Sequence, residues 1–254
     1  MGSVTPKKKL VSSRERAKSL ILAGKVRIGD EVADKPGRMC DEECPVRVIE
    51  DIHPYASRGG LKLEHALKEF EISLPGKTAV DLGASTGGFT DCMIQHGIEK
   101  VFAVDVGYGQ LDWKLQSDAR VISLDRKNAR DLKPEEIGEQ VDLVVIDVSF
   151  ISLKLVIPPA LSVLKPGGDL IALVKPQFEV GKAEVENKGI IKDPQKHLKV
   201  LRELFAFLAE KKWPMVNLTT SPITGQKGNR EFLIHCSDHG TEIDRERIEE
   251  KVLR

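Results

Sequence analysis

The chain has 254 residues, of which 41% are hydrophobic and 31% are charged, as in a globular protein with one large domain or a medium domain plus a small module. No apolar run approaches the roughly 20 residues that span a bilayer, and no apolar segment follows the early lysines as in a secretory signal. The four cysteines are too scattered for a disulfide framework, which favours a reducing, cytoplasmic setting.

The formal net charge is zero, but the charge is unevenly distributed. Residues 1–30 contain eight lysines and arginines against two acids, Glu15 and Asp30, so they carry +6 and the remainder of the chain carries −6. A basic end on a neutral protein is typical of a segment that binds a polyanion. A solvated terminal helix explains the charge alone equally well.

The first 50 residues are expected to form a small α+β module. A helix is predicted at residues 13–22, because Ser12 or Ser13 can cap it and Gly24 can end it. Short strands are predicted at residues 26–28 and 46–49. We therefore divide the chain into this module at residues 1–50, a linker at 51–57 and a larger domain at 58–254.

From residue 58 onward, predicted helices and strands alternate. Helices are expected at residues 62–70, 89–96 and 197–211. Strands are expected at residues 78–82, 101–105, 121–124, 143–147, 170–174 and 232–235, the fifth introduced by a turn at 165–168. Continuous apolar strands alternating with helices favour a mostly parallel sheet covered on both faces. The expected fold class is a doubly wound, Rossmann-like α/β domain after the small α+β module.

A glycine-rich turn, Asp81-Leu82-Gly83-Ala84-Ser85-Thr86-Gly87-Gly88-Phe89-Thr90, joins the first strand of this domain to its helix. Ligands of such sheets bind at the carboxyl ends of the strands. The turn lacks the second glycine of the dinucleotide fingerprint and the lysine of a P-loop. Asp81 suits a cationic methionine moiety better than a phosphate. Asp105 and Asp125 follow the next two strands, where they can accept hydrogen bonds from a ribose and an adenine.

Three acids lie at the ends of successive predicted strands, beside this turn. Together they predict a site for S-adenosylmethionine (SAM). A tight strand–helix turn with incidental acids is the simpler alternative. The residues predicted to bind the cofactor are Asp81, Gly83, Ala84, Ser85, Thr86, Gly87, Gly88, Asp105, Val106 and Asp125.

Five segments of the sequence together carry a resemblance to a known family. They are residues 53–63 (HPYASRGGLKL), 81–90 (DLGASTGGFT), 147–152 (DVSFIS), 174–179 (VKPQFE) and 221–232 (SPITGQKGNREF). Through them the chain resembles the bacterial hemolysin A/cytotoxin A (TlyA) family of rRNA 2′-O-methyltransferases, whose catalytic domain is similar to the FtsJ heat-shock methyltransferases. The resemblance extends from about residue 13 to residue 236. It implies SAM-dependent methylation of a ribose, with a cytidine of ribosomal RNA as the acceptor.

The resemblance also implies a Lys-Asp-Lys-Glu catalytic tetrad, which falls on Lys62, Asp147, Lys175 and Glu231. Asp147 ends the fourth strand and Lys175 follows the fifth, so both are expected at the same crevice. Methyl transfer to a hydroxyl needs an oriented nucleophile and a proton acceptor. We expect Lys175 to be the base or proton relay, and Asp147 and Lys62 to orient it and the hydroxyl. Glu231 would position Lys62 or the ribose. A structural ion-pair network is the alternative.

The N-terminal segment resembles an S4 RNA-binding module through residues 13–28. The helix that usually comes before it, of the R-L-D-x-x-L type, has no counterpart in residues 1–10, so the module is expected to be incomplete. Basic side chains would contact phosphates and position the RNA. The expected partners are ribosomal RNA and ribosomal subunits, and no membrane. The expected RNA-binding residues are Arg14, Arg16, Lys18, Lys25, Arg27 and Arg58.

Other chemistries fit these motifs less well. Asp147-Val148-Ser149-Phe150 does not resemble the [DN]-P-P-[YFW] motif of base amino-methyltransferases, and no cysteine lies near the fourth or fifth strand, as base C5 methylation requires. Cys40 and Cys44 lack a second pair of ligands nearby, so no metal site is expected. A non-catalytic RNA-binding or ribosome-assembly factor and a membrane-active hemolysin are the alternative functions.

Overall fold

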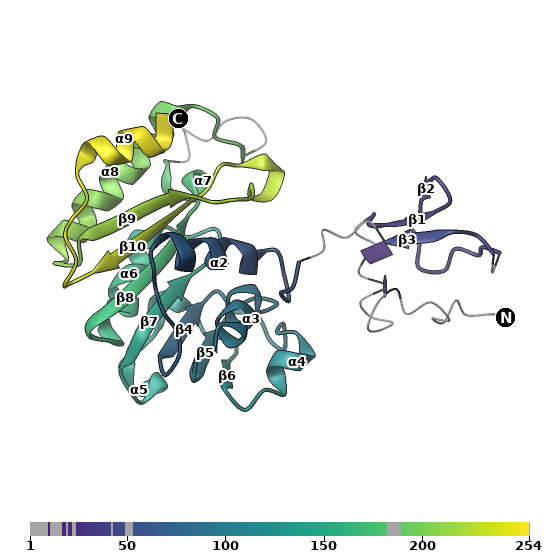
Figure 1. The fold of residues 1–254 in the computed structure, drawn as a ribbon, viewed down its shortest axis with the longest axis horizontal. Coiled ribbons are helices and arrows are strands. Elements are labelled where there is room, and N and C mark those ends of the chain that lie inside the picture. The colour runs from purple at the N-terminus through teal and green to yellow at the C-terminus, as the bar shows by residue number, and fades with distance from the viewer. Residues whose placement is uncertain are drawn as a thin grey trace. The chain divides into compact units, whose positions relative to one another are not determined.

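The computed structural model describes residues 10, 17–18, 20–21, 24–41, 43–48, 53–181 and 189–253. The chain divides into two compact units, Met1–Ile52 and His53–Arg254 (Figure 1). Among the described residues, no helix has both the length and the apolar character that crossing a membrane requires.

The first unit contains a small antiparallel sheet in the order β2-β1-β3. Its strands are β1 (Val26–Ile28), β2 (Glu31–Val32) and β3 (Val46–Val48). They confirm the strands predicted around residues 26–28 and 46–49, and Ile49 lies outside the described residues. Of the helix predicted at 13–22, residues 17–18 and 20–21 are helical and the others lie outside the described residues. Leu20, Val26 and Ala33 form the core of this unit.

The second unit is built on a sheet that has seven strands in the described part of the chain, in the order β6-β5-β4-β7-β8-β10-β9. The strands are β4 (Thr78–Leu82), β5 (Lys100–Val104), β6 (Val121–Leu124), β7 (Val141–Ile146), β8 (Leu164–Val174), β9 (Met215–Thr220) and β10 (Phe232–Ser237). Strands β6, β5, β4, β7 and β8 are parallel, whereas β10 runs antiparallel to both of its neighbours, β8 and β9. The predicted doubly wound α/β class is confirmed.

Successive strand residues point to opposite sides of this sheet, and apolar residues lie on both sides. Helices therefore cover both faces. On one face, α2 (Gly59–Glu69), α3 (Gly88–Gln95) and α4 (Trp113–Gln116) share an apolar cluster with Ala79. On the other face, α5 (Pro134–Ile137), α6 (Leu153–Ser162), α8 (Pro194–Glu210) and α9 (Arg245–Leu253) share a cluster with Val80 and Leu82. The short α7 (Pro176–Glu179) follows β8, and single 3₁₀ turns lie at η1 (Ala129–Asp131) and η4 (Gln226–Gly228).

The division into a module, a linker and a larger domain stays a prediction, and one expected turn needs correction. The boundary between the two compact units falls between Ile52 and His53, inside the linker expected at residues 51–57. Tyr55 is only 6% exposed, and the N–H of Ala56 donates to the Asp91 carboxylate at 2.6 Å, so this segment packs into the second unit. The turn expected at 165–168 lies inside the continuous strand β8, as an irregularity in its pairing with β7.

Candidate active site

The glycine-rich turn lies at the carboxyl edge of the sheet, where its backbone is held by neighbouring strands. The N–H groups of Gly83 and Ala84 donate to the Val104 carbonyl at 2.9 and 3.2 Å. Gly83 has φ +88°, and a Cβ there would come within 2.6 Å of the Asp147 carbonyl oxygen. A side chain at Gly83 would therefore be strained and would also push the turn away from β7.

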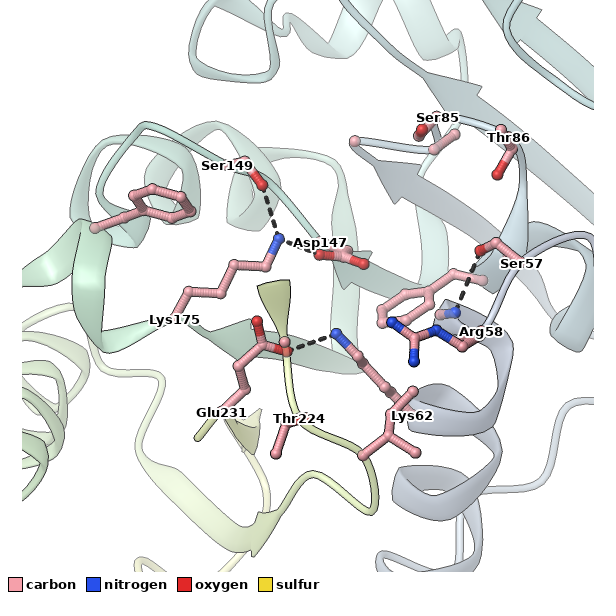
Figure 2. Close-up of a pocket in the computed structure, with 18 of the residues that line it drawn as sticks. Ser57, Arg58, Lys62, Ser85, Thr86, Asp147, Ser149, Lys175, Thr224 and Glu231 are labelled. Atoms are coloured by element: carbon pink, nitrogen blue, oxygen red, sulfur yellow. Dashed lines mark hydrogen bonds and ion pairs between the residues drawn. The ribbon is translucent and has the colours of Figure 1, made fainter. Parts of the chain in front are cut away.

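A cavity of about 340 Å³ opens beside this turn and contains all four members of the predicted tetrad. The residues that line it come from five segments of the chain (Figure 2). They are Ser57, Arg58, Gly59, Lys62, Gly83, Ala84, Ser85, Thr86, Gly88, Phe89, Asp147, Ser149, Lys175, Gln177, Phe178, Ile223, Thr224, Gly225 and Glu231.

Lys175 and Asp147 form one ion pair of the cavity. Lys175 Nζ lies 2.6 Å from Asp147 Oδ1, and it also donates a hydrogen bond to Ser149 Oγ at 2.9 Å (Figure 2). The Lys175 side chain is 11% exposed and that of Asp147 is 23% exposed. The pair can therefore be reached from the cavity while being largely shielded from water, which strengthens its electrostatic interaction.

Lys62 and Glu231 form the second ion pair. Lys62 Nζ, on α2, donates to Glu231 Oε2 at 2.5 Å, and the two side chains are only 11% and 2% exposed. The residues are 169 positions apart in the sequence. Glu231 thus contacts Lys62 directly, and the two lysines each have their own carboxylate.

Asp81 is fully buried under the glycine-rich turn. Its Oδ2 accepts a hydrogen bond from the Thr90 hydroxyl at 2.6 Å, while its Oδ1 has no hydrogen-bond partner among the described residues. Burial raises the pKa of the Asp81 carboxyl to about 7. The Asp147 carboxylate adds to this shift and the Thr90 hydroxyl opposes it. A buried carboxylate oxygen without a donor is a group that a cationic ligand would stabilise.

The two other predicted cofactor acids both accept hydrogen bonds from the loop after β5. Asp105 accepts hydrogen bonds from the N–H groups of Ser85 at 2.8 Å and Gly107 at 2.7 Å. Asp125 accepts from the Gly109 N–H at 2.9 Å and the Ser123 hydroxyl at 2.7 Å, and these bonds hold the pKa of Asp125 below its usual range.

Some predicted cofactor residues do not line the cavity, namely Asp81, Gly87, Asp105, Val106 and Asp125. Asp105 nevertheless connects its loop directly to the glycine-rich turn through Ser85. Val106 is 65% exposed beside it. Gly87 has φ +93° and packs against Leu115 of α4, where a Cβ would lie only 2.2 Å from the Leu115 side chain. Half of the predicted cofactor residues thus line the cavity, and the other half lie outside its lining.

The predicted RNA-binding residues lie in both units. Arg58 is exposed at the cavity, and Lys18 and Lys25 are exposed in the first unit. Arg27 is half-buried, and its guanidinium donates to the Asp30 carbonyl at 3.2 Å. Arg14 and Arg16 lie outside the described residues. In the described part of the chain, no three His, Cys, Asp or Glu side chains gather where they could hold a metal ion.

Several cavity residues were not singled out from the sequence. Ser149, Gln177, Phe178, Thr224 and Gly225 lie in the segments that carry the family resemblance, two to seven positions from a tetrad member. Their proximity to the tetrad in the sequence was the available signal. What it could not show is which of them points into the cavity.

Comparison with known proteins defines the class. A model of FtsJ-like methyltransferases matches residues 55–237, and an S4 domain model matches residues 7–43. With the doubly wound fold and the glycine-rich turn at the strand ends, the larger match defines the second unit as a methyltransferase.

Individual relatives extend over most of the chain. The 16S/23S rRNA (cytidine-2′-O)-methyltransferase TlyA of Mycobacterium tuberculosis is 44% identical over 89% of this chain and 84% of its own length. Hemolysin A of Brachyspira hyodysenteriae is 41% identical over 88% of this chain and 93% of its own length. A solved structure of a candidate hemolysin from Streptococcus thermophilus is 42% identical and has a TM-score of 0.79. The match covers 96% of this chain and 90% of that one. The chain belongs to the TlyA/hemolysin A family, whose catalytic domain is FtsJ-like.

Proposed function

We propose that this protein transfers a methyl group from SAM to the ribose 2′-hydroxyl of a cytidine in ribosomal RNA. The observation that carries the proposal is that Lys62, Asp147, Lys175 and Glu231 line one cavity with the glycine-rich turn. Two lysines and two carboxylates can orient a hydroxyl and accept its proton. No cysteine is among the residues that line the cavity, so a covalent attack on a pyrimidine ring has no nucleophile there.

The residues present fit SAM as the methyl donor. Asp81 offers a buried carboxylate oxygen without a donor, next to a turn whose Gly83 cannot carry a side chain. Asp105 and Asp125 would hold the nucleoside part, since carboxylates accept hydrogen bonds from hydroxyl and amino groups. When bound, SAM supplies a methyl group activated by its positively charged sulfur.

Lys175 is the group that takes the proton in this proposal. In its neutral form, its Nζ would accept the proton that the 2′-hydroxyl loses on methylation. SAM would supply the methyl group, with the bond from sulfur to the methyl carbon broken and S-adenosylhomocysteine as the leaving group. Asp147, 2.6 Å away, then stabilises the ammonium that results. Because the side chain is 11% exposed, little water competes for the nitrogen.

Lys62 has a different role, because its ammonium is paired with Glu231. A nearly buried ion pair has a fixed geometry, so we infer that Lys62 orients the acceptor ribose and that Glu231 positions Lys62. This assignment keeps one lysine charged while the other takes the proton.

The substrate class rests on the relatives and on the first unit. The Mycobacterium tuberculosis relative is named for cytidine 2′-O-methylation of 16S and 23S rRNA. The S4 match and the charge of +6 over residues 1–30 supply a second contact for a polyanion. Ribosomal subunits would therefore be the partners, and the cytoplasm the place of the reaction.

The experiment that tests this function is the mapping of 2′-O-methyl groups on rRNA from cells with and without the protein. We expect at least one cytidine to lose its methyl group when the protein is absent and to regain it with the wild type, but not with the Lys175→Ala variant. Unchanged rRNA methylation would contradict the proposal. Calorimetry that detects no SAM binding, with or without RNA, would favour a non-catalytic RNA-binding factor.

A further inference from the structure

Ser149 contacts the proposed base, although it is not a member of the tetrad. Lys175 Nζ donates to Ser149 Oγ at 2.9 Å and lies 2.6 Å from Asp147 Oδ1 (Figure 2). Both contact residues belong to the segment that follows β7 and are two positions apart. One short stretch of backbone therefore sets the direction of both contacts to the nitrogen.

The two contacts to Lys175 Nζ are suited to orienting a neutral lysine that acts as a base. A neutral lysine nitrogen has one bond to carbon, two N–H groups and one lone pair, in a tetrahedral arrangement. Ser149 accepts one N–H group, and the Asp147 carboxylate lies against the nitrogen as its ion-pair partner, so the two contacts together restrict the direction of the lone pair. With Asp147 alone, the amine could rotate about its terminal bond, and the lone pair would point in several directions.

The turn that carries Ser149 is held firmly. Phe150 has φ +64°, a conformation that is unfavourable for a residue with a side chain, and its ring packs against Phe178 at 4.9 Å between centroids. Glu179, in the same short helix as Phe178, accepts hydrogen bonds from the Leu153 N–H at 2.8 Å and the Ser152 hydroxyl at 2.7 Å. Backbone strain that persists because several contacts fix it is a feature of functional sites.

These contacts also fix Ser149 relative to Lys175. Phe178 and Glu179 belong to α7, which begins one residue after Lys175, and the Phe178 N–H donates to the Lys175 carbonyl at 2.9 Å. The segment that follows Lys175 is thus joined at two points to the turn of Ser149 and the residues after it. The side chain of Ser149 itself is exposed to the cavity.

We propose that Ser149 is a positioning residue, whose hydroxyl accepts one N–H of Lys175 and thereby directs the nitrogen lone pair at the acceptor 2′-hydroxyl. The inference rests on the proposed function and adds to the tetrad a residue that acts through Lys175. A threonine retains the hydroxyl, whereas an alanine removes it and leaves the turn intact. The pair Ser149→Ala and Ser149→Thr therefore isolates the hydroxyl.

The test is steady-state kinetics of the full chain with SAM and rRNA. For Ser149→Ala we expect kcat to fall about 10- to 100-fold, as for a misoriented catalytic group, with KM for rRNA and the Kd of SAM by calorimetry near wild type. Ser149→Thr should retain most of kcat. Ser162→Ala, at the end of α6 and outside the cavity, is the matched control and should behave as the wild type.

A second readout does not depend on turnover. In protein labelled with ¹⁵N-lysine, the Nζ resonance of Lys175, assigned through Lys175→Arg, should shift in Ser149→Ala and return towards the wild-type position in Ser149→Thr.

The outcomes separate this inference from the proposed function. A wild-type protein that methylates no rRNA contradicts both. An active wild type whose Ser149→Ala variant keeps kcat within about twofold contradicts the positioning role alone. So does a Ser149→Thr variant that loses as much activity as Ser149→Ala, because the hydroxyl would then not be the group that matters.

Discussion

Lys175 is the residue on which the proposed chemistry depends most. General base catalysis contributes about 10²- to 10⁴-fold to a rate, so we expect Lys175→Ala to lower kcat by a factor in that range. Lys175 contacts Asp147 and Ser149, not the loops of Asp105 and Asp125. The Kd of SAM, measured by calorimetry, should therefore change little.

The control for this variant is Lys154→Ala, which removes an exposed lysine paired with Glu203. We expect its kcat to equal that of the wild type. Near-normal turnover of Lys175→Ala would show that another group accepts the proton.

Asp81 makes stability depend on pH in an unusual direction. Its carboxyl has a pKa of about 7 in the folded protein, because it is fully buried, against about 3.9 in an unfolded chain. Between these values the folded state holds a proton that the unfolded state has released. The contribution of Asp81 to stability is therefore present below about pH 4, is lost as the pH rises to about 7, and is constant above that.

Asp81→Asn should remove this dependence, since an amide does not titrate in this range. We expect the difference in unfolding free energy between the wild type and Asp81→Asn to change by a few kcal/mol from pH 5 to pH 8, with the wild type losing stability. Denaturant unfolding at both pH values measures it. A difference that is the same at pH 5 and pH 8 would show that the folded-state pKa is not raised.

At the scale of elements, the connection between β9 and β10 carries Glu231 to the cavity. It closes tightly, with the Gly225 N–H donating to the Asn229 carbonyl at 2.8 Å. A Cβ at Gly225 would lie 1.8 Å from Glu231 Oε1, so Gly225→Ala must displace the carboxylate that holds Lys62. We expect this variant to stay folded and to lose kcat by about 10-fold or more, through misplacement of Lys62.

The matched control is Gly37→Ala, because a Cβ there meets nothing within 4 Å. Thermal unfolding and kcat should both be unchanged by it. If Gly225→Ala instead kept wild-type kcat, the Lys62–Glu231 pair would not be needed for the reaction.

The elements that the sequence predicted well are those with a strong apolar pattern. The bounds of β4 and β6 agree with the prediction, and the helices around α2, α3 and α8 differ by a few residues. α6 was missed because Pro158 and Pro159 lie inside it, and prolines usually interrupt helices. β9 (MVNLTT) was missed because half of it is polar.

For the site, the sequence left part of the pairing open. Glu231 was expected to position either Lys62 or the ribose, and Asp147 and Lys62 to orient Lys175 and the hydroxyl, whereas in the structure Lys62 contacts Glu231, and Lys175 contacts Asp147 and Ser149. Partners 169 residues apart are set by strand order, and side-chain direction decides which neighbour is reached. Neither can be read from spacing along the chain.

At the scale of the whole molecule, positive charge is concentrated in the first 30 residues. Residues 1–30 carry +6 in a chain whose net charge is zero, and the S4 match includes most of them. Binding of an RNA by lysines releases counterions, so each phosphate contact contributes about 0.7 to 0.9 to the slope of log K against log salt. The first unit should therefore set the salt dependence of rRNA binding, while the second unit sets the chemistry.

The double variant Lys18→Glu/Lys25→Glu tests this division, because both side chains are exposed in the first unit. We expect weaker rRNA binding and a slope reduced by about 2, measured by fluorescence anisotropy over a series of salt concentrations, with the Kd of SAM unchanged. Lys68→Glu/Lys211→Glu makes the same change of charge at exposed positions of α2 and the end of α8. If this control lowered the slope as much, affinity would depend on net charge and not on the N-terminal unit, and the assignment of RNA binding to that unit would be wrong.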